Sequence, residues 1–296
     1  TAANSLGCYV EDVLVCSTGG IGKPLPVSRV LKGISESVPG LATTEEAATK
    51  AATAIMTTDT VPKQSVRTGD GFTVGGMAKG AGMVRPDMAT MLVVLTTDAV
   101  VDPGVLQRTL RSAVDESFHA INIDGCPSTN DTVVLLASGR SGVKPSPAEL
   151  ADAVTGVCWD LANQLAADAE GASRVVTMEV RGASDDATAR NAGRLMTDSA
   201  LVRSAFYGGD PNWGRLLGAL GATDIPFDPN RFGVAYSGID VAKDGAAADH
   251  DGEALHRAIT EGDFEVTVTI GSGPGKATVI TTDLTPEYVK FNAEYS

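Results

Sequence analysis

Short apolar runs alternate with longer segments of helical periodicity along most of the chain. The short runs are rich in Val, Ile and Thr and are bounded by Gly, Pro, Asn or Asp, which is typical of strands. The pattern predicts strands at 13–16, 64–67, 72–75, 91–96, 133–137, 175–181, 232–236, 264–270 and 277–282. It predicts helices at 27–37, 43–56, 105–119, 146–169, 185–196 and 199–206. Mixed elements of this kind indicate an α/β (α+β) protein.

Two of the predicted helices carry clear start signals. Thr43 precedes Glu46 by three residues, and Ser146 is followed by Pro147 and Glu149. A hydroxyl three positions before Glu is the capping-box pattern, and Pro is favoured at the first helical position. In contrast, residues 208–215 mix Gly, Pro, Asp and Asn and are predicted to form an irregular loop.

Composition and charge exclude several classes of function. The chain has 23 basic and 37 acidic residues, a net charge of −14, which argues against binding nucleic acid or an anionic membrane through bulk charge. No apolar run approaches the 18 residues of a membrane span. The four cysteines show no CxxC spacing and have no nearby His, so neither a zinc site nor another metal site is expected, and they are interpreted as reduced thiols.

The segment 75–98 holds the strongest candidate for chemistry. A glycine-rich stretch containing Lys79 leads through Pro86 to Thr90, which starts the apolar strand predicted at 91–96. A threonine hydroxyl needs a nearby base, and none of the three histidines is close in sequence. If the bond between Ala89 and Thr90 were cut, the freed α-amino group, with a pKa of about 8, could serve as that base. On the residues alone, an ordinary β-branched strand residue remains the simpler interpretation.

A second candidate is the turn at 16–22, which contains Ser17, Thr18 and Gly19. Such a turn can aim a backbone N–H and a hydroxyl at one point, as an oxyanion hole requires. A simple strand-to-helix connection explains the same residues. The turn does not match the GxGxxG pattern of nucleotide-binding loops.

Taken together, several stretches resemble the ornithine acetyltransferase family, the glutamate N-acetyltransferases of arginine biosynthesis. The resemblance extends over essentially all 296 residues, and the matching stretches are 16–22, 55–60, 75–98, 128–132, 168–171, 210–215 and 288–296. It implies an Ntn-like layered αββα sandwich with a smaller C-terminal α/β lobe. It also places roughly the first quarter of the family's chain before residue 1, so this sequence is expected to be a fragment or to have lost an upstream part.

The resemblance also implies roles for individual residues. The family cuts itself before the Thr of an Ala-Thr-Met-Leu segment, so residues 1–89 and 90–296 are expected to become two associated pieces. Thr18 and Gly19 match the oxyanion hole, and Thr90 matches the nucleophile. The substrate contacts carried over are Thr57, Lys79, Thr90, Glu170, Asn292 and Ser296. Ser296 lies one place short of the family's final residue, so its contact is missing or shifted.

The implied reaction transfers an acetyl group from N2-acetyl-L-ornithine to L-glutamate through acetyl-Thr90, without a cofactor. Acetyl-CoA is a further candidate donor, an α2β2 assembly is the expected partner arrangement, and a cytoplasmic location is expected. Two alternatives remain at this stage. The chain could be an Ntn-type amidohydrolase or aminopeptidase of related fold, or an inactive fragment.

Overall fold

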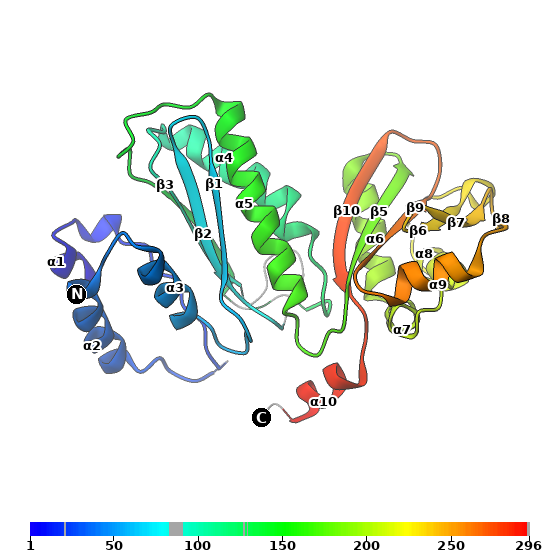
Figure 1. The fold of residues 1–296 in the computed structure, drawn as a ribbon, viewed down its shortest axis with the longest axis horizontal. Helices are drawn as coiled ribbons and strands as arrows, with labels where there is room; N and C mark the ends of the chain where they lie inside the picture. Colours follow the sequence, from blue (N-terminus) through cyan, green and yellow to red (C-terminus); the bar gives the residue numbers. More distant parts are fainter. Residues whose placement is uncertain (21, 83–90, 127, 129, 295–296) are drawn as a thin grey trace.

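The computed structural model describes residues 1–20, 22–82, 91–126, 128 and 130–294. Ala89, Thr90 and Ser296 lie outside these described residues. Two β-sheets, each with helices packed against it, form two lobes that lie side by side (Figure 1). The predicted α/β (α+β) class is confirmed.

The first 60 residues form short helices beside the first sheet (Figure 1). They are α1 (Ala2–Leu6), η1 (Val10–Asp12), α2 (Val27–Ser37), η2 (Val38–Gly40) and α3 (Glu45–Ala54). The strand expected at 13–16 is absent, because no described strand pairs with it, and Leu14 and Val15 are 60% and 84% exposed. The cap of α3 is Thr44 instead of Thr43, since the Thr44 hydroxyl accepts from Ala47 N at 3.2 Å.

The first sheet has the strand order β1-β2-β3-β4. Its strands are β1 (Lys63–Thr68), β2 (Thr73–Lys79), β3 (Leu92–Thr97) and β4 (Thr132–Ala137). The strands predicted at 64–67 and 72–75 are confirmed and pair antiparallel, with Val66 opposite Gly75. Strand β3 then pairs antiparallel with β2 and parallel with β4. Helix α4 (Pro103–Glu116) and the short η3 (Phe118–Ala120) belong to the crossover between β3 and β4.

Helix α5 (Pro147–Ala167) packs along β1 and β2 and also contacts α4. Its predicted capping box is confirmed: Ser146 Oγ accepts from Glu149 N at 3.3 Å, and Ser146 N donates to Glu149 Oε2 at 2.8 Å. The helix approaches the sheet closely at Gly76. A Cβ there would lie 2.5 Å from Leu95 Cδ2 and 3.0 Å from Leu161 Cδ1, so a larger residue would push α5 off the sheet.

The second sheet has the order β10-β5-β9-β6-β7-β8 and its own core. Its strands are β5 (Val175–Ala183), β6 (Gly233–Tyr236), β7 (Ile239–Lys243), β8 (Ala246–Ala247), β9 (Phe264–Thr269) and β10 (Gly275–Thr282). The helices of this lobe are α6 (Asp186–Asp198), α7 (Ala200–Gly208), α8 (Trp213–Gly221), η4 (Pro229–Arg231) and α9 (Gly252–Thr260).

Part of this lobe differs from the sequence-based expectation. The loop predicted at 208–215 ends early, because Trp213 already begins α8 and the Asn212 side chain caps it by accepting from Arg215 N at 3.2 Å. Strands β7 and β8 and helix α9 were not predicted. Each is short, and a short element offers little periodicity to detect.

Among the described residues, a β-bridge between Ile121 and Ile280 links the two lobes, and Asn122 N donates to Ile280 O at 2.7 Å. After β10 the chain turns back as α10 (Pro286–Glu294), which lies below the space between the lobes in Figure 1. Across the described ranges, no helix has both the length and the apolar character needed to cross a bilayer.

Candidate active site

Lys79 stands at the end of β2 and is 1% exposed. Burial lowers the pKa of its ammonium group, and the neighbouring carboxylate of Asp59 partly restores it. Lys63, Asp131 and Glu170 also act electrostatically on Lys79. The carboxylates around Lys79 favour its charged form, and a further carboxylate that binds Lys79 must compete with them.

Glu170 follows α5, and its amide donates to Ala81 O at 2.9 Å. Burial raises the pKa of its carboxyl group, while hydrogen bonding from the side chains of Thr58 and Asn292 opposes that rise. The carboxylate lies against the backbone at Gly82, where a Cβ would come within 2.3 Å of Glu170 Oε2. Glu170 and Asn292, predicted from distant segments, are therefore neighbours.

The C-terminal segment is fixed beside Glu170 by a set of buried contacts. The Thr285 hydroxyl donates to Gly171 O at 2.5 Å and accepts from Tyr288 N at 3.0 Å. Gly171 has φ +66°, and a Cβ there would lie 2.3 Å from Tyr288 N, so the tail requires glycine at this point. Arg203 Nε donates to Thr282 O at 2.9 Å and holds the turn before α10.

The polar loop before β4 connects the two predicted catalytic segments. Asn130 Nδ2 donates to the carbonyl oxygen of Ser17, directly before Thr18. Asp131 Oδ1 accepts from Met91 N at 2.8 Å, directly after Thr90. Burial raises the pKa of Asp131 to about 6, although the Met91 hydrogen bond opposes the rise. These two contacts indicate that the loop braces both segments and is more than a plain turn.

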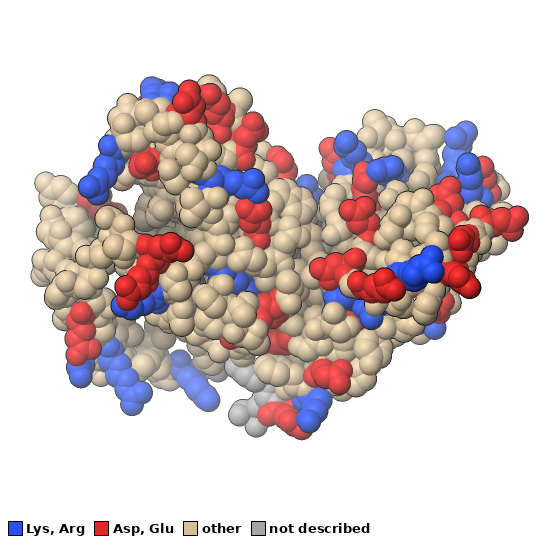
Figure 2. All heavy atoms as spheres, viewed as in Figure 1, with Lys and Arg blue, Asp and Glu red and all other residues tan. Residues whose placement is uncertain are grey.

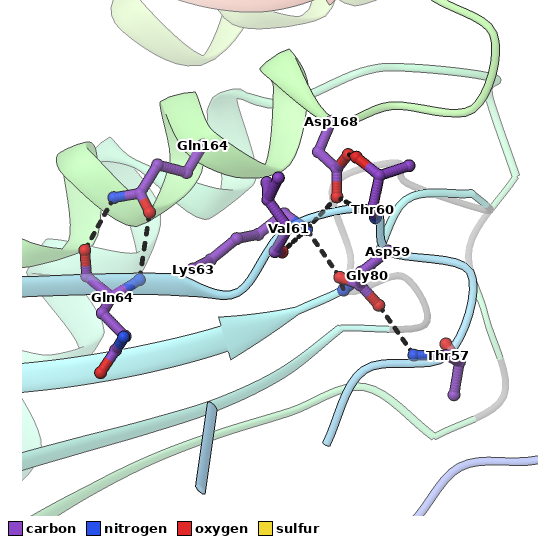
Figure 3. Close-up of polar contacts among 9 residues, drawn as sticks. All are labelled: Thr57, Asp59, Thr60, Val61, Lys63, Gln64, Gly80, Gln164 and Asp168. Carbon is purple, nitrogen blue, oxygen red and sulfur yellow. Dashed lines mark hydrogen bonds and ion pairs between the residues drawn. The ribbon is translucent and has the colours of Figure 1, made fainter. Parts of the chain in front are cut away.

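A buried ionic group next to Lys79 was not predicted. Lys63 Nζ lies 2.7 Å from Asp59 Oδ1 and 2.5 Å from Asp168 Oδ2, and the Lys63 side chain is fully buried (Figure 3). Asp59 and Asp168 fall inside stretches that carry the family resemblance, but their pairing with Lys63 depends on tertiary structure. Sequence spacing alone gives no sign of it.

Thus four of the predicted substrate residues lie around one region, namely Thr57, Lys79, Glu170 and Asn292. Thr18 is half-buried and Gly19 is exposed, and their segment is tied to this region through Ser17. Ala89, Thr90 and Ser296 fall outside the described residues, so their predicted roles stay predictions.

The region is polar in character. Within the described ranges, no three His, Cys, Asp or Glu side chains gather closely enough to hold a metal ion. A surface hollow of about 940 Å³ lies elsewhere, between residues 40–51 and β1. On the face drawn in Figure 2, acidic and basic side chains are interspersed over both lobes. The site is therefore distinguished by particular buried charges and not by a large patch of one sign.

Comparison with known proteins gives one consistent family. The family model described as ArgJ family matches residues 1–296. The arginine biosynthesis bifunctional protein ArgJ of Thermobifida fusca (strain YX) is 46% identical over 300 residues, covering 100% of this chain and 77% of the relative. The protein of the same name from Streptomyces coelicolor is 47% identical over 295 residues, covering 100% of this chain and 76% of the relative.

A solved structure is also similar. The crystal structure of the arginine biosynthesis bifunctional protein ArgJ from Bacillus halodurans matches with a TM-score of 0.65 and 34% sequence identity. The match covers 69% of this chain and 98% of the solved chain.

Proposed function

The chain belongs to the ArgJ family, and on that premise we propose that it is a glutamate N-acetyltransferase of arginine biosynthesis. Its reaction moves the acetyl group from N2-acetyl-L-ornithine to L-glutamate. The observation that supports this most is the convergence of Thr57, Lys79, Glu170 and Asn292, which come from separate segments. Both amino acids carry an α-carboxylate, and buried Lys79 suits that group as a charged partner.

The proposed nucleophile is the Thr90 hydroxyl, made available by self-cleavage of the bond from Ala89. Attack of Thr90 Oγ on the Ala89 carbonyl breaks the peptide bond, which frees the Thr90 amine and leaves an ester between Ala89 and Thr90 Oγ. Water then cleaves this ester into the Ala89 carboxylate and the free Thr90 hydroxyl. That amine is then the base for the hydroxyl. The support is indirect: Met91 and the loop at Asp131 hold the chain directly after Thr90 by a 2.8 Å hydrogen bond.

The transfer itself takes two steps. Thr90 Oγ attacks the acetyl carbonyl of acetylornithine, ornithine leaves with its amine protonated, and an acetyl ester remains on Thr90. The glutamate amine then attacks this ester, and Thr90 recovers its hydroxyl proton as acetylglutamate leaves. The backbone N–H of Gly19 and the Thr18 hydroxyl are the proposed donors to the oxyanion in each step. Loss of one such donor lowers rates by about 10²–10³.

Cleavage would leave two pieces, 1–89 and 90–296, that stay associated. The Bacillus halodurans chain matches 69% of this chain, about the share that residues 90–296 would make up. An α2β2 assembly in the cytoplasm, using small-molecule substrates and no cofactor, completes the proposal. Whether acetyl-CoA also donates an acetyl group to glutamate is tested by the same transfer assay with acetyl-CoA as the donor.

The decisive experiment combines intact mass with a transfer assay. Purified protein should give two species that sum to 30.3 kDa plus one water, with the break between Ala89 and Thr90. It should form acetylglutamate from acetylornithine and glutamate, and Thr90→Ala should abolish both cleavage and transfer. An uncut Thr90→Ala variant that still transfers acetyl groups would overturn the proposed nucleophile. Acetate release without glutamate, as fast as transfer, would instead indicate the hydrolase.

A further inference from the structure

The buried ionic group consists of Asp59, Lys63 and Asp168, which we name the anchor triad. Asp59 and Lys63 have no exposed side-chain surface, and the Asp168 side chain is 6% exposed. Hydrogen bonds from Gly80, Lys63 and Thr57 outweigh the effect of burial and hold the pKa of Asp59 below its usual range. Asp59 is therefore ionised at neutral pH, and the triad is almost entirely buried.

Asp59 connects two of the proposed substrate segments directly. Its Oδ2 accepts from Thr57 N at 3.0 Å, and its Oδ1 accepts from Gly80 N at 2.7 Å (Figure 3). Gly80 follows Lys79 in the chain, so one carboxylate fixes the backbone of both Thr57 and Lys79. These two segments have no helix or strand in common.

Asp168 extends the connection to Glu170. It is the C-terminal cap residue of α5, it accepts from Thr60 N at 2.9 Å, and its other oxygen accepts from the Thr60 hydroxyl. Glu170 lies two residues later and donates its amide to Ala81 O at 2.9 Å. The backbone from Gly80 to Gly82 is consequently held from both sides, by Asp59 and by Glu170.

Stability alone does not explain this arrangement well. A buried ion pair commonly contributes no more than apolar residues of similar volume would, because both charges lose their hydration. Strand β1 and α5 already share a second ion pair, in which Arg67 lies 2.8 Å from Asp160, and that pair is largely exposed. The buried triad, unlike the exposed pair, is bonded to the backbone at two of the proposed substrate contacts, to Thr57 N and to Gly80 N directly after Lys79.

We infer that Asp59 is a positioning residue for substrate binding, which holds Thr57 and Lys79 at the spacing that an amino-acid α-carboxylate requires. The inference rests on the proposed function. Because both substrates present the same α-carboxylate in their ground and transition states, misplacing these contacts weakens binding of both substrates to similar extents. Loss of such uniform binding raises KM and leaves kcat nearly unchanged.

The test is Asp59→Asn, assayed by steady-state kinetics with each substrate varied in turn. Both carboxylate oxygens of Asp59 accept hydrogen bonds, whereas asparagine has one accepting oxygen and one NH2 group. In the variant, this NH2 group therefore faces a backbone N–H that has lost its acceptor. We expect KM to rise roughly tenfold to a hundredfold for both acetylornithine and glutamate, the range that charge-assisted hydrogen bonds support. We expect kcat per cleaved molecule to change less than about threefold.

Asp160→Asn is the matched control, because Asp160 also pairs α5 with a basic residue of β1. It should leave both KM values unchanged. If Asp59→Asn does not fold, the double variant Asp59→Asn/Lys63→Met is the alternative, because it removes both charges of the Asp59–Lys63 pair. It should show the same rise in KM. An Asp59→Asn enzyme with wild-type KM values, or an equal rise in Asp160→Asn, would refute the positioning role. Failure of the wild-type protein to transfer acetyl groups would refute the proposed function instead.

Discussion

At the scale of single residues, the most unusual group beside the proposed nucleophile is Asp131. Its carboxylate is half-buried, and the pKa rises to about 6 because burial disfavours the charged form. A group whose folded pKa exceeds its unfolded pKa near 3.9 favours the folded state when protonated. That contribution is complete below about pH 4 and disappears as the pH rises through 6.

We therefore expect Asp131→Asn to be more stable than the wild-type protein at pH 7.5. Asparagine keeps an oxygen for Met91 N and carries no charge. The gain should be on the order of 1 kcal/mol, since solvent screening reduces the full effect of the shift. Thermal or urea unfolding between pH 4 and 7.5 measures it. A variant whose stability falls with pH as steeply as the wild type would contradict the prediction.

At the scale of elements, the tail α10 depends on one buried hydroxyl. The Thr285 hydroxyl satisfies both Gly171 O and Tyr288 N, and the residue is 2% exposed. The same turn delivers Asn292 to Glu170. A local change at Thr285 should therefore reach the site through the position of α10.

Thr285→Val keeps the side-chain volume but removes both hydrogen bonds. We expect a loss of about 1–3 kcal/mol in the free energy of unfolding, and a higher KM for both substrates because Asn292 is less well held. Unfolding and steady-state kinetics measure the two effects. Thr281→Val is the control, because the buried Thr281 hydroxyl has no hydrogen-bond partner among the described residues. Equal effects from both variants would show that α10 does not depend on this contact.

Comparison of the elements with the sequence-based predictions shows which structural features are determined by local sequence. The start of α5 was predicted from Ser146, Pro147 and Glu149, because a capping box is formed by residues within one turn. The run at 13–16 has strand composition, but a strand needs a partner and none of the described strands provides one. Helix α8 was missed because Gly and Asn around its start are typical of loops, although Asn212 serves as its cap.

In the candidate site, too, local sequence identifies single residues, whereas tertiary structure determines which of them are neighbours. Thr57, Lys79, Glu170 and Asn292 were identified through resemblance, and only the tertiary structure shows them near one another. The anchor triad could not be predicted, because Lys63 and Asp168 are 105 positions apart and neither has an unusual local pattern. Long-range pairing of charges leaves no periodic trace in a single sequence.

At the scale of the whole molecule, the two lobes have two core clusters and meet at a junction where Ile280 of β10 packs into the core of the first lobe. Asn122 occupies this junction and is 1% exposed. Its Nδ2 lies 2.7 Å from Thr197 Oγ1, 2.9 Å from Asp198 Oδ1 and 3.1 Å from Arg194 O, all at the end of α6. The side chain thus ties the crossover of the first lobe to a helix of the second.

Asn122→Ala should lower the free energy of unfolding by roughly 1–3 kcal/mol, because buried acceptors lose their donor. For a chain of this length, each kcal/mol corresponds to about 2–4 °C in the unfolding temperature. Calorimetry measures the shift. Asn163→Ala removes a comparable bond, from Nδ2 to Trp159 O at 2.9 Å, at an exposed position, and should shift the temperature little. Equal shifts in both variants would mean that the junction contributes no special stability.

The pairing of β2 with β3 has a further consequence if the chain is cut between positions 89 and 90. Every residue pair in that ladder then joins one polypeptide to the other, and Gln64 and Gln164 add two reciprocal hydrogen bonds of 3.0 Å across the same divide. Each half would carry two strands of a four-stranded sheet. The molecule would then be a natural split enzyme, whose separately produced halves recover a continuous sheet only by complementing each other.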